Sequence, residues 1–381
     1  RYSWGKVGND AGIPRWQYVS SWLKTNKATF FGDPVTQPGY PIYLEGDVAN
    51  PNIHWEVAEK QDIGVELGLF KNLITMSFDY YWENRTDMFI RAEDRSKNAI
   101  FGADLPSANL GELKSHGWEF EMNFSKARPD SRLWGKFNIA KINNEVVERD
   151  DPELTPDYQK EAGFELGQQR TQVASGIIQT WDEMYTGVTL LDNSKYLPGD
   201  YRMIDYNADG VINEDDIIPW AFSVIPEYSY GLTVGYDYKG FGIMAQFYGV
   251  FNVSGTNNIY NEFRYNYSIA YDFQYNDSWA PELGRTTGDN LYPHVRYNYY
   301  SPKAQYYVWD YSFFKLQNTE ISYTFSGSQL TNAGVNQLRL FVNAGNILIW
   351  NKTLEDRDRP TTNYYQYPIL KRYSLGLNIS F

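Results

Sequence analysis

The sequence closes on ILKRYSLGLNISF, residues 369 to 381, and this stretch decides the fold. The odd-numbered residues from Tyr373 to Phe381 are all large and apolar, whereas those from Ser374 to Ser380 between them are small or polar. Successive side chains of a β-strand point to opposite faces, so this period of two predicts a strand with one apolar and one polar face. Such a strand fits a wall between lipid and a water-filled lumen. It also fits the last strand of a soluble sandwich, so the rest of the chain must decide.

The same alternation recurs along all 381 residues. Apolar residues alternate from Ile63 to Leu69, the pair Lys71-Asn72 forms a turn, and the alternation resumes from Ile74 to Trp82. This pattern is typical of a β-hairpin. We predict about eleven strands, over Arg1–Val7, Pro14–Leu23, Glu59–Phe70, Leu73–Asn84, Trp118–Phe124, Arg132–Val146, Tyr230–Tyr238, Phe241–Phe251, Asp310–Phe325, Val335–Trp350 and the terminal stretch.

The connections between these strands are of two kinds. Short turns join them on one side, and long loops join them on the other, near 25–58, 85–111, 147–225, 253–308 and 351–368. Short periplasmic turns and long exterior loops are the outer-membrane arrangement, which favours a transmembrane antiparallel β-barrel over a propeller or sandwich. Bacterial barrels have even strand totals, and the chain opens at Arg1 without a signal peptide, so we expect upstream strands in a longer polypeptide.

Composition supports a membrane setting. The chain holds 33 Tyr, 21 Phe and 12 Trp, with only 21% charged residues. Tyr and Trp suit the interface between membrane and water, where one end of the ring is apolar and the other is wet. No window approaches 18 consecutive apolar residues, so no transmembrane helix is predicted, and a membrane-spanning form must be a barrel.

Charge and cysteine content exclude several classes of protein. The formal net charge is −13, and no basic patch is present, which argues against nucleic-acid binding. The absence of cysteine excludes disulfides, zinc-thiolate sites and a cysteine nucleophile. Three histidines occur without a metalloprotease, serine-hydrolase or Walker motif, so no enzymatic role is predicted. Glu119 and Glu121 share a strand face and are interpreted as part of a wet, acidic wall.

An ordered set of short strings resembles one family across essentially the whole chain. The strings are WGKVGND at 4–10, NPNIHWE at 50–56, IGVELGLF at 63–70, SFDYY at 77–81, GELKSHGWE at 111–119, DYNADGVI at 205–212, SWAPE at 278–282, SFFKLQN at 312–318 and the closing YSLGLNISF. In this order and spacing they resemble the SusC-like TonB-dependent transporters (SusC/RagA family) of the Bacteroidetes outer membrane.

This resemblance implies that residues 1–381 form the C-terminal portion of a roughly 22-stranded barrel whose plug domain lies upstream. It implies uptake of oligosaccharides or peptides, driven by TonB through the missing N-terminal region, with a SusD-like surface lipoprotein as lid. Two alternatives remain open at the level of sequence. One is a soluble, secreted β-rich protein that binds or cleaves glycans, and the other is a passive porin or a siderophore-type transporter.

One segment has the ligand pattern of a calcium loop. Carboxylate, amide or carbonyl oxygens fall at loop positions 1, 3, 5, 7, 9 and 12, and Gly210 falls at position 6. The predicted ligands are Asp205, Asn207, Asp209, Val211 (through its carbonyl), Asn213 and Asp216. Position 12 is Asp rather than Glu, which shortens the reach of that ligand. The alternative is an acidic Asx-turn without metal.

Aromatic residues in the long loops are the candidate substrate contacts. Flat rings offer apolar faces to sugar C–H groups or to peptide side chains. The same residues also suit loop packing or a protein interface, so that interpretation stays open. The substrate-binding candidates are Trp181, Trp220, Tyr260, Trp279, Tyr299 and Tyr364.

Overall fold

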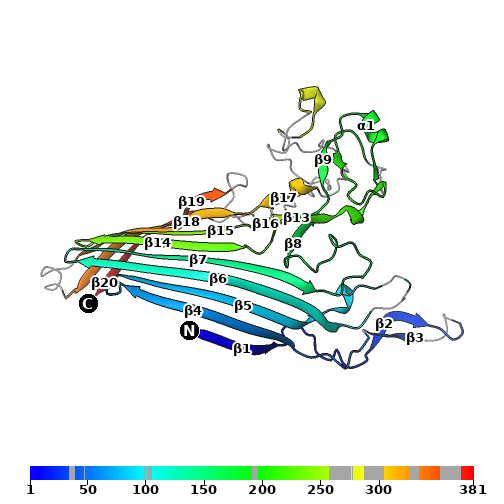
Figure 1. Cartoon of the computed structure of the whole chain (residues 1–381), viewed down its shortest axis with the longest axis horizontal. Coiled ribbons are helices and arrows are strands. Elements are labelled where there is room, and N and C mark those ends of the chain that lie inside the picture. Colours follow the sequence, from blue (N-terminus) through cyan, green and yellow to red (C-terminus); the bar gives the residue numbers. More distant parts are fainter. Residues whose placement is uncertain are drawn as a thin grey trace. The chain divides into compact units, whose positions relative to one another are not determined.

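The protein is all-β, and ten strands of the described residues pair in one sheet. The computed structural model describes residues 1–33, 39–46, 48–97, 100, 105–190, 196–256, 276, 278–286, 304–325, 334–351 and 370–381. The strand order is β1-β4-β5-β6-β7-β14-β15-β18-β19-β20 (Figure 1). Its members are β1 (Tyr2–Asn9), β4 (Glu56–Leu69), β5 (Ile74–Ile90), β6 (Ala108–Arg128), β7 (Ser131–Glu148), β14 (Tyr228–Tyr238), β15 (Phe241–Phe251), β18 (Phe313–Phe325), β19 (Gln337–Asn351) and β20 (Arg372–Ser380).

The remaining elements are short and belong to the long connections. They are β2 (Trp22–Thr29), β3 (Tyr40–Glu45), β8 (Gln168–Thr171), β9 (Ala174–Ile177), β10 (Thr189–Leu190), β11 (Tyr201–Met203), β12 (Val211–Ile212), β13 (Ile218–Ser223), β16 (Ser254–Thr256), β17 (Val308–Asp310), the helix α1 (Trp181–Thr186) and single turns of 3₁₀-helix at Ala92–Asp94, Glu214–Asp216, Pro281–Leu283 and Gln305–Tyr307. Within the described ranges, no helix has the length and apolar character needed to cross a membrane.

Internal contacts divide the chain into two compact units. Unit 1 comprises Arg1–Gly64, Asp79–Gly117 and Asn143–Leu166, and unit 2 comprises Val65–Phe78, Trp118–Ile142 and Gly167–Phe381.

Strand register in unit 2 aligns apolar side chains into rows. One row crosses six strands, because each member is the Cα partner of the next. It consists of Leu133, Tyr236, Ile243, Ile321, Val342 and Leu375. These side chains are between 41% and 81% exposed. The apolar face of these strands is therefore uncovered, whereas a soluble sheet buries such a face against a second layer.

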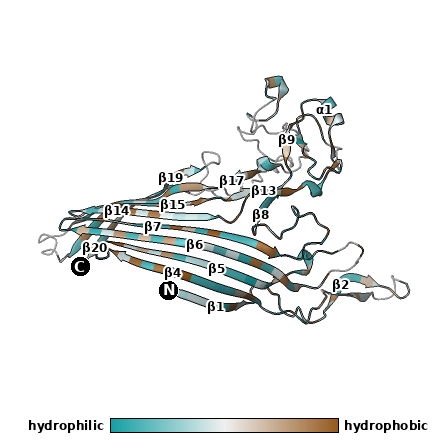
Figure 2. Cartoon of the chain, in the orientation of Figure 1, coloured by the Kyte–Doolittle hydropathy of each residue, from teal (hydrophilic) through white to brown (hydrophobic). Residues whose placement is uncertain are grey.

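The neighbouring row, one residue along, projects to the opposite face. It consists of Trp134, Gly235, Met244, Glu320, Asn343 and Ser374. Asn343 Nδ2 donates to Asn318 Oδ1 at 2.8 Å, and Arg339 forms an ion pair with Glu320. Figure 2 shows the resulting alternation of hydrophilic and hydrophobic positions along the strands. Apolar positions exposed on one face and hydrogen-bonded polar groups on the other are the pattern of a membrane barrel strand.

On the polar face of the terminal strand, there is no room for a side chain at Gly376. A Cβ built on Gly376 would lie 2.1 Å from Cζ of Phe341, so the Phe341 ring covers the β20 backbone there. The predicted alternation from Tyr373 to Ser380 is confirmed as β20.

The predicted hairpin around Lys71-Asn72 is also confirmed. Strand β4 ends at Leu69 and β5 begins at Ile74. Phe70, Lys71 and Asn72 all have left-handed φ angles of 54° to 62°, which reverse the chain.

The predicted strand over Pro14–Leu23 is wrong, and within the described part of the chain ten strands rather than eleven form the sheet. One turn precedes that segment, where Ile13 N–H donates to the Asp10 carbonyl at 3.1 Å, and another lies within it, where Val19 N–H donates to the Trp16 carbonyl at 3.0 Å. Trp16 has a φ of 69°, which breaks an extended conformation. A strand begins only at Trp22 and pairs with β3 in a separate two-stranded sheet.

Four expected loops contain structure of their own. The loop near 25–58 includes β3, and the loop near 85–111 includes the end of β5, the 3₁₀ turn at Ala92–Asp94 and the start of β6. The loop near 147–225 includes β8 to β13 and α1, and the loop near 253–308 includes β16. The loop near 253–308 is described only in part, and from the loop near 351–368 only Asn351 lies among the described residues.

Candidate functional site

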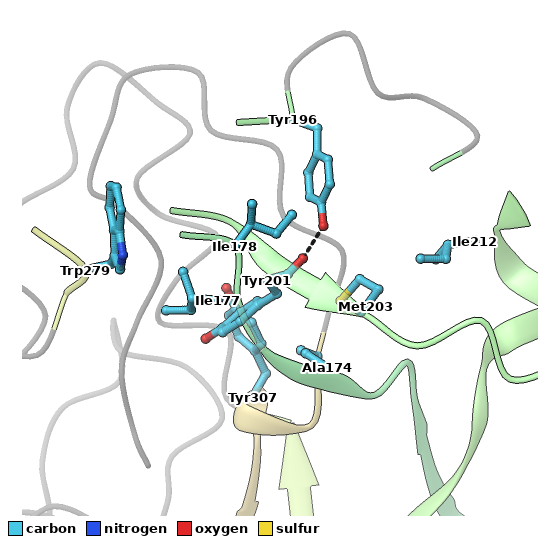
Figure 3. Packing of buried hydrophobic residues seen from close by; sticks show 10 residues of the cluster. Ala174, Ile177, Ile178, Tyr196, Tyr201, Met203, Ile212, Trp279 and Tyr307 are labelled. Carbon is cyan, nitrogen blue, oxygen red and sulfur yellow. Dashed lines mark hydrogen bonds between the residues drawn. The ribbon is translucent and has the colours of Figure 1, made fainter. Parts of the chain in front are cut away.

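The loops of unit 2 have a buried core of their own, centred on Tyr201 (Figure 3). Tyr201 is completely buried on β11, and its ring stacks on Tyr306 with 5.0 Å between ring centroids. The other buried members are Ala174, Ile177, Ile178, Tyr196, Met203, Ile212, Trp279, Ala304 and Tyr307. We call this set the loop core. Packing of this kind gives the long connections a defined structure on which binding residues can be held.

A buried phenol helps to fix the loop core. The Tyr196 hydroxyl donates to the carbonyl oxygen of Tyr201 (Figure 3). Burial, and then the nearby Asp200 carboxylate, raise the pKa of Tyr196 well above its ordinary value of 10.0.

The described substrate candidates are of two kinds. Trp279 is 8% exposed, belongs to the loop core, and donates its indole N–H to Gln179 Oε1 at 2.9 Å. Trp181, at the start of α1, is 52% exposed, and Trp220, on β13, is 38% exposed. Of the three described candidates, Trp181 and Trp220 therefore present substantial ring surface for a ligand, and Trp279 does not. The other three candidates, Tyr260, Tyr299 and Tyr364, lie outside the described residues.

The acidic loop from Asp205 to Asp216 is organised by its own side chains. Asp205 accepts from the backbone N–H groups of Asp209 at 3.2 Å and Gly210 at 2.9 Å. Gly210 has a φ of +90°, a conformation that explains glycine at this position. Asp216 is buried and accepts from the N–H groups of Tyr206 at 2.7 Å and Asn213 at 2.8 Å.

This geometry fits a calcium ion only in part. Both oxygens of Asp216 already accept backbone hydrogen bonds, which reduces their freedom to serve as a metal ligand. Across the described ranges, no group of three or more His, Cys, Asp or Glu side chains is placed to hold a metal. Asp205, Asn207 and the Val211 carbonyl are still oxygen ligands of the type that calcium takes. The calcium site stays a prediction.

A polar cavity of about 480 Å³ lies at the short-turn end of β4, β5 and β6 in unit 2. Its polar lining includes Glu66, Asn72, Ser77, Glu121 and Asn123. Glu121 accepts from Asn123 Nδ2 at 2.9 Å and pairs with Lys136 at the same distance. These partners give Glu121 the surroundings expected of a wet wall.

A second cavity, of about 460 Å³, lies in unit 1. It is lined by the turns between Asp10 and Tyr18 and by Ile53, His54 and Trp55, and we call it the rim pocket. The sequence pattern does not indicate this pocket, because alternation predicts a strand over Pro14–Leu23. The exposed aromatic residues Trp16, Tyr18 and Trp55 were the signal that could have indicated it.

Comparisons with known proteins agree with this architecture. A family model described as "TonB dependent receptor-like, beta-barrel" matches residues 16–258. TonB-dependent receptor P26 of Formosa agariphila is 24% identical over 420 residues, which cover 100% of this chain and 39% of that protein. TonB-dependent receptor P3 of the same organism is 24% identical over 363 residues, which cover 88% of this chain and 35% of that protein.

Solved structures show the same fold. The RagAB peptide transporter superimposes with a TM-score of 0.73 at 18% identity, covering all of this chain and 40% of the matched chain. The RagAB peptide importer in its "closed-closed" state gives a TM-score of 0.72 at 19% identity, with the same coverage. The chain thus spans about two fifths of the length of these relatives.

Proposed function

Because the chain belongs to the TonB-dependent receptor β-barrel family of the bacterial outer membrane, we propose that it works within a SusC-like importer of oligosaccharides or peptides. In this proposal, TonB drives uptake from the inner membrane, and a SusD-like surface lipoprotein covers the exterior mouth. The observation that supports it most directly is the pair of opposed rows in unit 2: exposed apolar side chains on one face and hydrogen-bonded polar groups on the other. That arrangement suits a barrel wall with a water-filled interior.

Exposed aromatic residues in the loops support oligosaccharides or peptides as the substrate class. Trp181 and Trp220 present exposed rings, and such rings can pack on sugar C–H groups or on peptide side chains. The related RagAB proteins are described as a peptide transporter and a peptide importer. We place oligosaccharides first and peptides second for this chain, as the SusC-like resemblance implies.

A passive porin is the alternative, and energy dependence distinguishes the two. We would compare uptake of labelled oligosaccharides and peptides by cells with and without functional TonB, using the full-length protein in its natural membrane. Loss of uptake without TonB supports the importer, whereas unchanged uptake favours the porin. In the same preparation, mass spectrometry of proteins that co-purify in mild detergent tests the lid. Repeated absence of a surface lipoprotein would contradict that part of the proposal.

The exposed loop tryptophans provide a second test. Trp181→Ala should reduce uptake, because it removes a ring face without opening a core. Leu154→Ala is the control. Leu154 lies in the same long loop, is apolar and highly exposed, and was not predicted to bind substrate. An equal effect of the two substitutions would contradict a substrate role for Trp181.

A further inference from the structure

The rim pocket combines aromatic faces with charged groups. Its aromatic lining is Trp16, Tyr18 and Trp55, and its charged or titratable lining is Asp10, Arg15 and His54. Within the described ranges, Arg15 is exposed and no carboxylate forms an ion pair with it. His54 Nε2 lies 3.7 Å from Asp87 Oδ1. The pocket therefore offers flat apolar surfaces beside one guanidinium group.

The face on which Trp55 lies can be followed along the β1–β4 ladder. Lys6 Nζ pairs with Glu59 at 3.1 Å, and the Tyr2 hydroxyl donates to Gln61 at 2.9 Å, so these side chains share one face. Ile63, two residues beyond Gln61, is on the same face and is 47% exposed. It begins the exposed apolar series of β4 that ends at Leu69.

The opposite face of the same ladder is polar and linked by hydrogen bonds. Asn9 Nδ2 donates to Glu56 at 3.2 Å, and Arg1 forms an ion pair with Asp79. By the alternation of side chains, the face of Ile63 is the lipid side, and the face of Glu56 is the inner side.

Trp55 lies on the lipid side. Gly8 is the partner of Val57, two residues along from Lys6, and a Cβ built on Gly8 would lie 2.8 Å from Cε3 of Trp55. The indole ring therefore covers the ladder on the same face as Lys6 and Ile63. This ring forms one wall of the rim pocket, so that wall lies on the lipid side.

Its depth can be derived from strand geometry. The apolar band of a barrel is about 25 Å tall, and strands rise about 3.3 Å per residue with a tilt near 40°. The exposed apolar series of β4 begins at Ile63, and Trp55, eight residues before it in the chain, lies roughly 20 Å beyond that series along the barrel axis. Since β4 begins at the end opposite the short Lys71-Asn72 turn, this level is on the exterior side.

We propose that the rim pocket binds the phosphorylated saccharide headgroup of a glycolipid in the outer leaflet. The rings of Trp16 and Trp55 would pack on sugar C–H groups, and Arg15 would pair with a phosphate, since a guanidinium matches phosphate oxygens bidentately. The source is a membrane glycolipid rather than a soluble nutrient, because the Trp55 wall of the pocket shares its face with the exposed apolar residues of β4. This inference does not rest on the transport proposal.

Binding to the full-length protein, purified from outer membranes in mild detergent, tests the proposal. Native mass spectrometry would count retained lipopolysaccharide, and tryptophan fluorescence would follow titration with purified lipopolysaccharide, its delipidated core oligosaccharide, and phosphatidylethanolamine vesicles. Trp55→Ala and Arg15→Ala should each weaken lipopolysaccharide binding by about fivefold or more. Trp22→Ala should leave it unchanged; Trp22 is 67% exposed and Trp55 62%, but Trp22 lies outside the pocket.

The outcomes separate the possible ligands. Equal binding by all three variants would overturn the proposal. Core oligosaccharide that binds as tightly as intact lipopolysaccharide would overturn the membrane source and assign the pocket to a soluble saccharide. Phosphatidylethanolamine that competes equally would overturn saccharide recognition. Because uptake is not the readout, these results are independent of whether the protein proves to be an importer.

Discussion

The paired strands and the loop core of unit 2 use apolar side chains in opposite ways. On the strands, residues such as Val342 and Leu375 are exposed, and the polar partners on the other face are linked by hydrogen bonds. In the loop core, Tyr201 and Met203 are covered by other side chains, as in a soluble domain. The same chain is therefore adapted to two surroundings. Its strands expose apolar side chains, as in contact with lipid, whereas its loops bury them, as in contact with water.

The largest effect is expected from opening the loop core. Tyr201→Ala removes a completely buried ring and should cost about 3–5 kcal/mol of local stability. Limited proteolysis of the loops would detect the loss as faster cleavage between residues 174 and 212. Tyr185→Ala is the control, because Tyr185 is 75% exposed. Similar cleavage of both variants would show that the loops do not depend on this core.

A charged residue on the lipid side tests whether the exposed apolar face of the strands lies in lipid. Leu375→Arg should destabilise the membrane-embedded protein by about 2–4 kcal/mol, the cost of Arg near the midplane on the lipid face of a barrel. Ser374→Arg, one residue away on the polar face, should cost far less. Urea unfolding in lipid vesicles measures both. Equal destabilisation would mean that the two faces of β20 do not meet different solvents.

The sequence predicted the strand region well because alternation is a local signal. The hairpin of β4 and β5 and the terminal strand β20 follow directly from residues two apart in the chain. The Pro14–Leu23 segment was predicted wrongly because Pro14, Trp16 and Tyr18 line the rim pocket rather than a sheet face, and a strand begins only at Trp22. A local pattern does not show which segment will bend at a residue such as Trp16.

The loop core could not be predicted in this way. Its members come from distant segments of the chain, and the hydrogen bond from Trp279 to Gln179 joins residues 100 positions apart. Their aromatic character indicated binding, packing or a protein interface equally well, and only the fold separates the buried Trp279 from the exposed Trp181. Contacts between distant segments leave no periodic pattern in the sequence from which they could be predicted.

A calcium ion at the predicted site would stabilise the loops and not the strands, because all of its predicted ligands lie between Asp205 and Asp216. If the predicted site is correct, calcium at about one hundred times its dissociation constant should stabilise the acidic loop by about 2.7 kcal/mol. Proteolysis with calcium and with chelator measures the difference. Asp209→Ala should abolish the calcium dependence, and Asp215→Ala, which removes the same charge from a residue outside the predicted ligands, should keep it. No calcium dependence in the unsubstituted protein would leave an Asx-turn as the explanation.

The smallest effect concerns the hydrogen bond that closes the loop core. Tyr196→Phe removes the hydroxyl that donates to the Tyr201 carbonyl and should cost about 0.5–1.5 kcal/mol. The pH dependence gives the sign. Because burial raises the pKa of Tyr196 above its ordinary value of 10.0, the folded loop favours the neutral phenol. Its contribution is therefore complete below about pH 10 and is lost as the pH rises toward the raised pKa.

Loop proteolysis between pH 8 and 11 should therefore accelerate less steeply in Tyr196→Phe than in the unsubstituted protein, because the variant has no phenol to ionise at that position. Tyr185→Phe is the matched control: its parent residue is exposed, and the substitution should leave the alkaline profile unchanged. Urea unfolding of the strands should not respond to either substitution. If Tyr196→Phe changed strand unfolding as much as loop proteolysis, the loop core and the strands would not be independently stable, which would contradict the comparison made above.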